Sequence, residues 1–284
     1  MSATPAVFSQ QLAYLKKRFN LLTAREIGEW MRAKNGLPPN AALITFDDGY
    51  YDNLSEAYPL LKAHRLSALI FLTTDFVGKT RPTFWDTTAY CFYHTQKDAL
   101  QTPLAGTLCW GNEAEKEAAM MRWIEATKAL PDDEKSAAVQ KLPGLLDVSV
   151  PEGVFSKLFL TWPQVRDLAH NGIEIGSHTA SHPIMTRISI EQVRTELSES
   201  KKWIEEEIGQ AVEYFAYPNG QSSDLNEQII TEVQNAGYKL AFTLINGTNP
   251  YNQINRSPYT LKRIFLSYRD SFPRFAARVN GLRI

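Results

Sequence analysis

The sequence contains two short segments whose side chains could together bind a metal ion and activate water. The first is the pair of adjacent carboxylates Asp47 and Asp48, which precedes Gly49 at the end of an apolar stretch. Aspartate and glycine are common where a strand ends, so a turn explains one of these carboxylates. Two adjacent carboxylates repel each other, however, and a nearby cation would relieve the repulsion.

The second segment carries two of the five histidines of the chain, His178 and His182, directly after another apolar stretch. Their spacing of four residues places both rings on one side of a helical turn, as metal sites with two histidines require. Pro183 prevents a regular helix from running through this segment. A pair of surface histidines in a loop is the alternative interpretation.

One aspartate and two histidines would supply three metal ligands and leave one coordination position open. Three protein ligands are typical of catalytic zinc, whereas structural zinc almost always has four. The remaining aspartate of the pair is then free to act as a base on water. A third segment, Tyr214–Gly220, contains Pro-Asn-Gly, which is typical of a turn.

Apolar strands alternate with helices along most of the chain, which favours an α/β fold with a parallel sheet or barrel. All three segments fall at the carboxyl ends of predicted strands, where α/β barrels build their active sites. The predicted strands are 41–46, 67–72, 173–176, 213–217, 240–244 and 261–267. The predicted helices are 8–22, 23–36, 54–64, 161–171, 190–208 and 223–237, the last capped by Ser223.

In order, the three segments resemble the motifs of the NodB-homology polysaccharide deacetylases, which form carbohydrate esterase family four. The resemblance runs from about residue 8 to the C-terminus. It implies an α/β fold, a distorted (β/α)7 barrel, and we expect residues 1–284 to form a single domain of this kind. Residues 84–160 are charged and helix-prone, and we interpret them as a helical insertion after the second predicted strand, able to form a wall or lid over a site.

The resemblance also implies the roles of individual residues in a metal-dependent removal of acetyl groups from sugars. Asp47 would be the catalytic base, and the backbone N–H of Asn219 would help to hold the oxyanion. The implied metal ligands are Asp48, His178 and His182. The implied metal is Zn2+, for which Co2+ or Ni2+ could substitute. The implied groove residues are those of the third motif, Tyr217, Pro218 and Asn219.

Two features depart from the family pattern. Ala216 stands where many members have an arginine that orients the base, and no histidine follows His182 to act as general acid. We hypothesise that Arg263 replaces the arginine, because it lies on a late strand that should return to the mouth of the barrel. Asp47, once protonated, could return its proton to the leaving amine, and His94 in the insertion is the alternative acid.

Several aromatic side chains suit either sugar stacking or core packing, and core packing is the commoner fate. We expect Tyr50, Trp85 and Tyr217 to contact the substrate. Tyr238 suits either sugar stacking or core packing. Asp86, beside Trp85, suits either a hydrogen bond to a sugar hydroxyl or the start of a helix.

The composition excludes several other classes of protein. The 30 basic and 31 acidic residues give a formal net charge of −1, which predicts no binding of nucleic acid. No apolar run approaches the roughly 20 residues of a membrane span, so we expect no integral membrane segment. The N-terminal residues do not resemble a signal peptide, which predicts a soluble cytoplasmic protein. The two cysteines, Cys91 and Cys109, cannot form a disulfide framework.

We therefore expect a metal-dependent hydrolase that removes N-acetyl groups from an amino sugar of a polysaccharide or its precursor. One alternative is a deformylase or other hydrolase of linear amides, acting on a nucleotide-linked or lipid-linked sugar. The other is a non-catalytic carbohydrate-binding barrel, which the missing arginine and histidine favour. The intact Asp47, Asp48, His178 and His182 favour the enzyme, because a binding module needs no base beside a metal.

Overall fold

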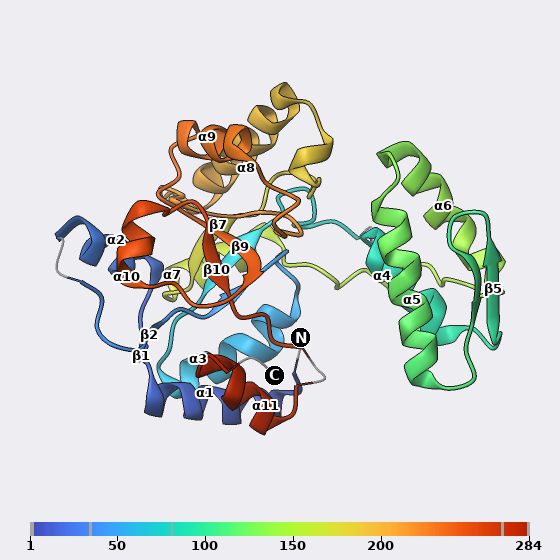
Figure 1. The fold of residues 1–284 in the computed structure, drawn as a ribbon, viewed down its shortest axis with the longest axis horizontal. Helices are drawn as coiled ribbons and strands as arrows, with labels where there is room; N and C mark the ends of the chain where they lie inside the picture. Colours follow the sequence, from blue (N-terminus) through green and yellow to red (C-terminus); the bar gives the residue numbers. More distant parts are fainter. Residues whose placement is uncertain (1–2, 34–35, 81, 268–269, 283–284) are drawn as a thin grey trace. The chain divides into compact units, whose positions relative to one another are not determined.

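The computed structural model describes residues 3–33, 36–80, 82–267 and 270–282. The chain forms two compact units (Figure 1). The first unit comprises Met1–Lys79 and Phe159–Ile284, and the second comprises Thr80–Leu158. Within the described residues, no helix combines the length and the apolar character that crossing a membrane requires.

The first unit is built around a parallel sheet of six strands in the order β10-β9-β8-β7-β4-β3. Because the strands run parallel, their carboxyl ends share one edge of the sheet, and this edge carries the three motifs. The result is the α/β distorted barrel expected from the sequence, with six strands in the sheet. The strands are β3 (Thr45–Phe46), β4 (Leu69–Leu72), β7 (Glu174–Ser177), β8 (Tyr214–Ala216), β9 (Leu240–Asn246) and β10 (Leu261–Arg263).

The predicted strand 41–46 is divided in the structure. Its first part, β2 (Ala41–Ala42), pairs in parallel with β1 (Asn20–Leu21) in a separate two-stranded sheet. Its second part is β3, which pairs with β4 of the main sheet. The two halves of one apolar stretch thus pair with different strands, and the local sequence does not specify this division.

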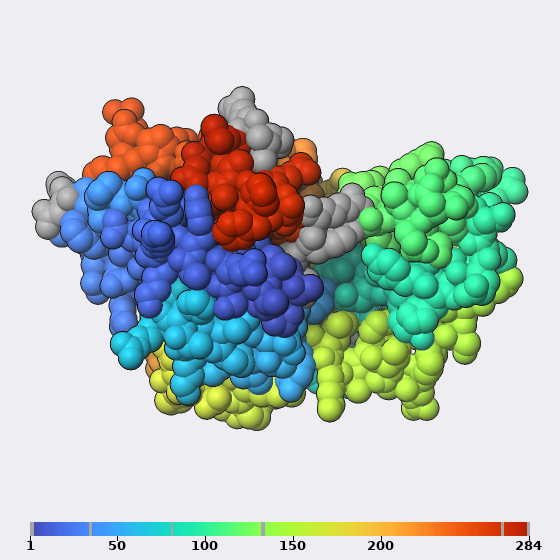
Figure 2. Space-filling view, turned by 90° about the horizontal axis from the view of Figure 1, so that it is seen from below, coloured from blue at the N-terminus to red at the C-terminus, as the bar shows by residue number. Residues whose placement is uncertain are grey.

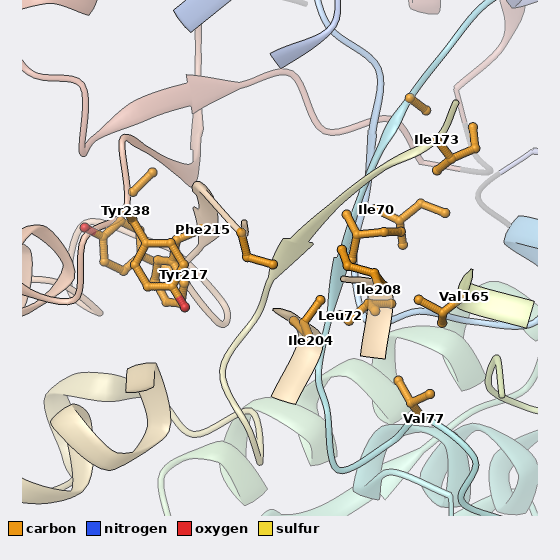
Figure 3. Packing of buried hydrophobic residues seen from close by; sticks show 14 of the residues in the cluster. Ile70, Leu72, Val77, Val165, Ile173, Ile204, Ile208, Phe215, Tyr217 and Tyr238 are labelled. Carbon is orange, nitrogen blue, oxygen red and sulfur yellow. The ribbon is translucent and has the colours of Figure 1, made fainter. Parts of the chain in front are cut away.

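Successive side chains along each strand point to opposite faces of the sheet, and two hydrophobic clusters result. Ile70 and Leu72 of β4 pack with Phe215 of β8 in the cluster that the surrounding helices cover (Figure 3). Leu69 and Phe71 belong to the other cluster, on the opposite face of the sheet. This second cluster also contains Tyr214, Ala216, Leu240, Phe242 and Leu261.

The helices of the first unit largely follow the predictions, but two of them were not predicted. The first three are α1 (Pro5–Arg18), α2 (Ala24–Ala33) and α3 (Tyr58–His64), the last preceded by a π-helical turn at Asn53–Ala57. Next come α7 (Trp162–His170), a short 3-10 turn at Met185–Arg187, α8 (Ile190–Ile208) and α9 (Glu227–Asn235). The helices not predicted are α10 (Tyr251–Arg256) and α11 (Phe272–Val279). Figure 2 shows α11 beside α1, where Tyr14 packs edge-on against Phe275 with the ring centroids 5.8 Å apart.

The capping residues explain where α8 and α9 begin. Ser189 and Gln192 form a capping box at the start of α8, as predicted. The predicted cap of α9 was wrong: Asn226, not Ser223, accepts the backbone N–H of Ile229 at 3.0 Å. Asparagine and serine are comparable caps, so local sequence did not separate the two positions.

The second unit contains the predicted helices and, in addition, a β-hairpin that was not predicted. Its helices are α4 (Phe84–His94), α5 (Glu113–Lys128) and α6 (Asp132–Leu145). The hairpin pairs β5 (Ala99–Thr102) with β6 (Gly106–Cys109) in antiparallel register. The unit has its own hydrophobic core, which includes Phe92, Trp110, Trp123 and Leu142.

Candidate active site

The polar residues of the first two motifs lie on loops at the carboxyl edge of the sheet. Asp48 follows β3, and His178 and His182 follow β7. Three residues of these loops have left-handed backbone conformations, with φ of 67° at Asp48, 69° at Thr179 and 63° at His182. This conformation is least costly for glycine, asparagine, aspartate and histidine, so Thr179 is the exception.

Asp48, His178 and His182 converge on one point. The Oδ1 atom of Asp48 lies 3.8 Å from Nε2 of His178 and 3.6 Å from Nε2 of His182. All three candidate ligand atoms lie within 4.8 Å of one another. Two ligand atoms that share one zinc ion, at bonds of about 2.0–2.2 Å, lie roughly 3–4 Å apart. A carboxylate with two imidazoles at this spacing suits zinc or a similar divalent transition metal.

The ring of His178 is oriented by the backbone of β8. Its Nδ1 atom lies 2.7 Å from the carbonyl oxygen of Ala216. A carbonyl oxygen only accepts hydrogen bonds, so Nδ1 carries the proton and Nε2 keeps a lone pair available for a metal. Hydrogen bonds of this kind fix the orientation of metal-binding histidines.

Asp47 is held by Arg263 rather than by a residue of the third motif. Nη1 of Arg263 donates to Oδ1 of Asp47 at 2.7 Å, and Nη2 donates to Oδ2 at 2.8 Å. The guanidinium also donates through Nε to the carbonyl oxygen of Thr243 at 2.9 Å and lies 5.7 Å from the centre of the Phe71 ring. Both residues of the ion pair are thus fixed in one orientation.

The site shifts the pKa values of Asp47 and His178. Burial raises the pKa of Asp47, but the positive charge of Arg263 and its hydrogen bonds outweigh burial, so the pKa lies below the ordinary 3.8. Burial lowers the pKa of His178 below 6.5, although the charge of Asp47 opposes this shift. At neutral pH, Asp47 is therefore ionised and His178 is neutral. These are the protonation states that a base and a metal ligand need.

The predicted substrate contacts of the first unit lie in different environments. Tyr50 is half-buried, with its ring centroid 5.0 Å from that of Phe159. Tyr217 is fully buried in the core, where its hydroxyl donates to the carbonyl oxygen of Tyr259 at 2.9 Å. Its ring offers no face to a sugar, so its position does not support the predicted role in the groove.

The other two residues of the third motif, Pro218 and Asn219, lie in the loop that follows β8. Pro218 is buried, whereas Asn219 is partly exposed and has a φ of 60°. The side-chain amide of Asn219 donates to Oδ2 of Asp224 at 2.6 Å. Tyr238 is also a core residue, since its buried hydroxyl donates to the carbonyl oxygen of Leu197.

The remaining candidates belong to the second unit. Trp85 packs edge-on against Phe84, with 4.9 Å between ring centroids. The carboxylate of Asp86 accepts the backbone N–H and the hydroxyl of Thr83, so it starts a helix. His94 is exposed and stacks on Tyr90 at 4.0 Å. The roles of Trp85 as a sugar contact and of His94 as an acid stay predictions.

Two side chains that support the site were not predicted from the sequence. Glu196 of α8 accepts hydrogen bonds from the loop between the two histidines. Phe76 stacks on the ring of His182, with 6.2 Å between centroids and 26° between planes. Neither residue belongs to one of the motifs. A turn and the start of a helix separate Glu196 from His182, so the local sequence does not indicate that the two segments meet.

The chain segments that lead into and out of the second unit are tied to the loops of the site. After β4, the N–H of Asp75 donates to the carbonyl oxygen of Ala180 at 2.9 Å. On the return, the N–H of Leu160 donates to the carbonyl oxygen of Gly49 at 2.9 Å. The two segments are also joined to each other, because the N–H of Gly78 donates to the carbonyl oxygen of Leu160 at 2.8 Å.

Comparison with known proteins gives a consistent result. The sequence profile of the family described as polysaccharide deacetylase matches residues 34–241. The protein YxkH of Bacillus subtilis (strain 168), named as a candidate polysaccharide deacetylase, is 22% identical over 265 residues. The match covers 93% of this chain and 65% of YxkH, so the chain spans less than two thirds of that relative's length.

Solved structures show the same fold. The deacetylase PplD of Streptococcus pyogenes, solved in complex with acetate, superposes with a TM-score of 0.63 at 19% identity, covering 98% of this chain and 87% of that one. IcaB from Ammonifex degensii gives a TM-score of 0.62 at 18% identity, covering 98% and 89%. At these identities, the similarity establishes the fold alone.

Proposed function

Because the chain belongs to the polysaccharide deacetylase family, we propose that it is a metal-dependent hydrolase that removes N-acetyl groups from an amino sugar of a polysaccharide or of its precursor. One observation carries the proposal: the cluster of Asp48, His178 and His182 stands beside a carboxylate, Asp47, that an arginine holds ionised. A site that only bound sugar would need neither the base nor its arginine.

The cluster would hold Zn2+, with Co2+ or Ni2+ as substitutes. The fit rests on the donor set and on the Nε2 lone pair of His178, which its bond to Ala216 leaves available. A divalent ion held there supplies Lewis acidity, which polarises an amide carbonyl and lowers the pKa of water.

Asp47 would act as the base. Its carboxylate accepts a proton from the water that attacks the acetyl carbon, while Arg263 holds both carboxylate oxygens in place. The backbone N–H of Asn219 would donate to the carbonyl oxygen as negative charge develops there. The C–N bond then breaks, and protonated Asp47 returns its proton to the leaving amine. Asp47 would thus serve as base and acid in turn.

A second candidate function is a non-catalytic carbohydrate-binding barrel. Two departures from the family pattern favour it. Ala216 stands where many members have an arginine, and no histidine follows His182. The contact between Arg263 and Asp47 argues against decay of the site, because an arginine on another strand holds both oxygens of the carboxylate.

The experiment is an assay of acid release. Zinc-loaded protein is incubated with N-acetylglucosamine oligomers, with the nucleotide-linked monosaccharide and with the N-formylated form of each, and acetate and formate are quantified. Acetate released by the parent and lost in Asp47→Asn supports the deacetylase, and formate alone supports the deformylase alternative. Zinc binding without release of either acid, and with retention of the oligomers, would favour the binding barrel.

A further inference from the structure

The loop that joins the two histidine ligands is held from one side by a single carboxylate. Oε2 of Glu196 accepts the backbone N–H of Ala180 at 2.8 Å and that of Ser181 at 2.9 Å. Oε1 of the same carboxylate accepts the Ser181 hydroxyl at 2.6 Å. Ala180 and Ser181 lie between His178 and His182, so Glu196 acts on the short segment that sets the separation of the two rings.

This segment has a backbone that does not hold itself in place. Thr179 and His182 both have positive φ, and the branched side chain of Thr179 makes that conformation costly, by about 1–3 kcal/mol. Two internal hydrogen bonds support the loop: the N–H of His182 donates to the Thr179 hydroxyl at 3.0 Å, and this hydroxyl donates to the carbonyl oxygen of His178. A strained loop persists only where its surroundings fix it, and the Glu196 carboxylate supplies three hydrogen bonds from outside the loop.

The helix that carries Glu196 is itself firmly anchored. Val193 and Leu197, on either side of it, are fully buried in the main core. One turn further on, the buried hydroxyl of Ser200 lies 2.8 Å from that of Ser177, the last residue of β7. The carboxylate therefore projects from a position that is fixed relative to the strand that leads to His178.

We propose that Glu196 is a positioning residue of the metal site, which sets the distance between His178 and His182 before a metal binds. The inference rests on the proposed function for the metal itself. A preformed ligand pair binds more tightly than one that must be ordered on binding, and partners outside the ligand set typically contribute 10–100-fold to metal affinity.

A second carboxylate offers a matched control at the opposite end of the same strand. Glu174, the first residue of β7, accepts the backbone N–H groups of Ala24 and Arg25 at 2.6 and 2.9 Å. It therefore holds two adjacent peptide groups, as Glu196 does, but at the edge of the sheet away from the metal ligands. Loss of Glu174 removes the same kind of structural bond without touching the histidine loop.

The test is zinc affinity measured by competition with a chromophoric chelator, for the parent, Glu196→Ala, Glu196→Gln, Ser181→Ala and Glu174→Ala, beside the melting temperature of each metal-free protein. We expect Glu196→Ala to weaken zinc binding at least tenfold. Gln, which keeps one oxygen and a donor, should restore part of this loss. Glu174→Ala should lower the melting temperature of the metal-free protein but leave the zinc affinity unchanged.

Two outcomes overturn the inference, and they are distinguishable. A parent that binds zinc, with Glu196→Gln, Ser181→Ala and Glu196→Ala binding it equally well, removes the positioning role and leaves the proposed function intact. A parent that does not bind zinc removes the metal site and the inference together. If Glu196→Ala does not fold, Glu196→Gln and Ser181→Ala, which remove fewer hydrogen bonds, decide the question.

Discussion

Arg263 and Asp47 connect the two outer strands of the sheet. Arg263 is the last residue of β10 and Asp47 directly follows β3, and these strands lie at opposite ends of the strand order. The paired hydrogen bonds of 2.7 and 2.8 Å therefore span the opening of the curled sheet. Nη1 of Arg263 also lies 3.4 Å from the hydroxyl of Thr45 within β3. The same ion pair thus orients the proposed base and joins the two sides of the barrel.

Substitution of Arg263 by Ala should lower kcat/KM for an N-acetylated substrate at least tenfold, because Asp47 loses its orientation and its low pKa. The kcat/KM of Arg263→Lys should lie between those of the parent and of Arg263→Ala, since lysine keeps the charge but not the paired donors. The measurement is the initial rate of acetate release by zinc-loaded protein.

Arg18→Ala is a suitable control for this prediction, because Arg18 is an exposed basic residue at the end of α1. It should leave the rate unchanged. A rate at the parental level in Arg263→Ala would refute the role of Arg263 in the reaction.

Removal of the metal should change both the zinc content per chain and the melting temperature of the protein. The parent, loaded with zinc and freed of excess, should retain close to one ion per chain by elemental analysis. Asp48→Ala and His178→Ala should retain almost none, because two protein ligands remain. A chelator should lower the melting temperature of the parent only, since a ligand that binds the folded state stabilises it. Equal zinc content in the parent and in Asp48→Ala would contradict the ligand assignment.

The metal-free protein should lose stability as the pH falls below about 6.5. Burial lowers the pKa of His178 in the folded state, so between the folded value and 6.5 the unfolded chain binds a proton that the folded chain does not. Stability therefore rises with pH in this window, by at most about 1.4 kcal/mol per pH unit for one group. Urea unfolding of chelator-treated protein between pH 5.5 and 7.5 measures the slope.

The slope should be reduced in His178→Gln and retained in His170→Gln, which changes an exposed histidine outside the site. If both variants keep the parental slope, groups other than His178 cause the pH dependence.

Gly176 should be intolerant of even one added methyl group. A Cβ there would lie 2.6 Å from Cδ1 of Phe71 and 3.0 Å from the carbonyl oxygen of Tyr214. Phe71 supports the guanidinium of Arg263, so the clash would also disturb the site. We expect Gly176→Ala to lower the free energy of unfolding by about 1–3 kcal/mol.

Gly144→Ala is the matched change in α6, where an added Cβ meets nothing within 4 Å. It should be neutral or stabilising by up to about 1 kcal/mol, because alanine favours a helix over glycine. Denaturant unfolding of the two variants, measured side by side, tests the difference, and equal stabilities would show that Phe71 moves aside without cost.

Much of the metal cluster was predictable because the signal is local. Asp48, His178 and His182 lie directly after apolar strands, and the carboxyl ends of parallel strands meet at one edge. Arg263 was predictable for the same reason, since a late strand returns to that edge. The alternation of strands and helices likewise predicted the α/β barrel.

The parts that were not predictable depend on contacts between distant segments. Whether Tyr217 faces a groove or the core depends on what covers its face of the sheet, and Tyr259 and the core cover it here. The carboxylate of Glu196 meets the histidine loop only because α8 packs against β7. Likewise, the division of residues 41–46 between two sheets depends on β1, an element too short to have a pattern of its own.

The hydrogen bond between Gly78 and Leu160 means that the chain path of the barrel is already closed where residues 80–158 depart and return. These residues have their own core, and the barrel's clusters are formed without them. A short glycine-serine linker could therefore replace them with little loss of loop entropy. We expect the shortened chain to fold and to bind zinc, so that residues 80–158 constitute a segment that can be exchanged while the fold of the barrel is preserved.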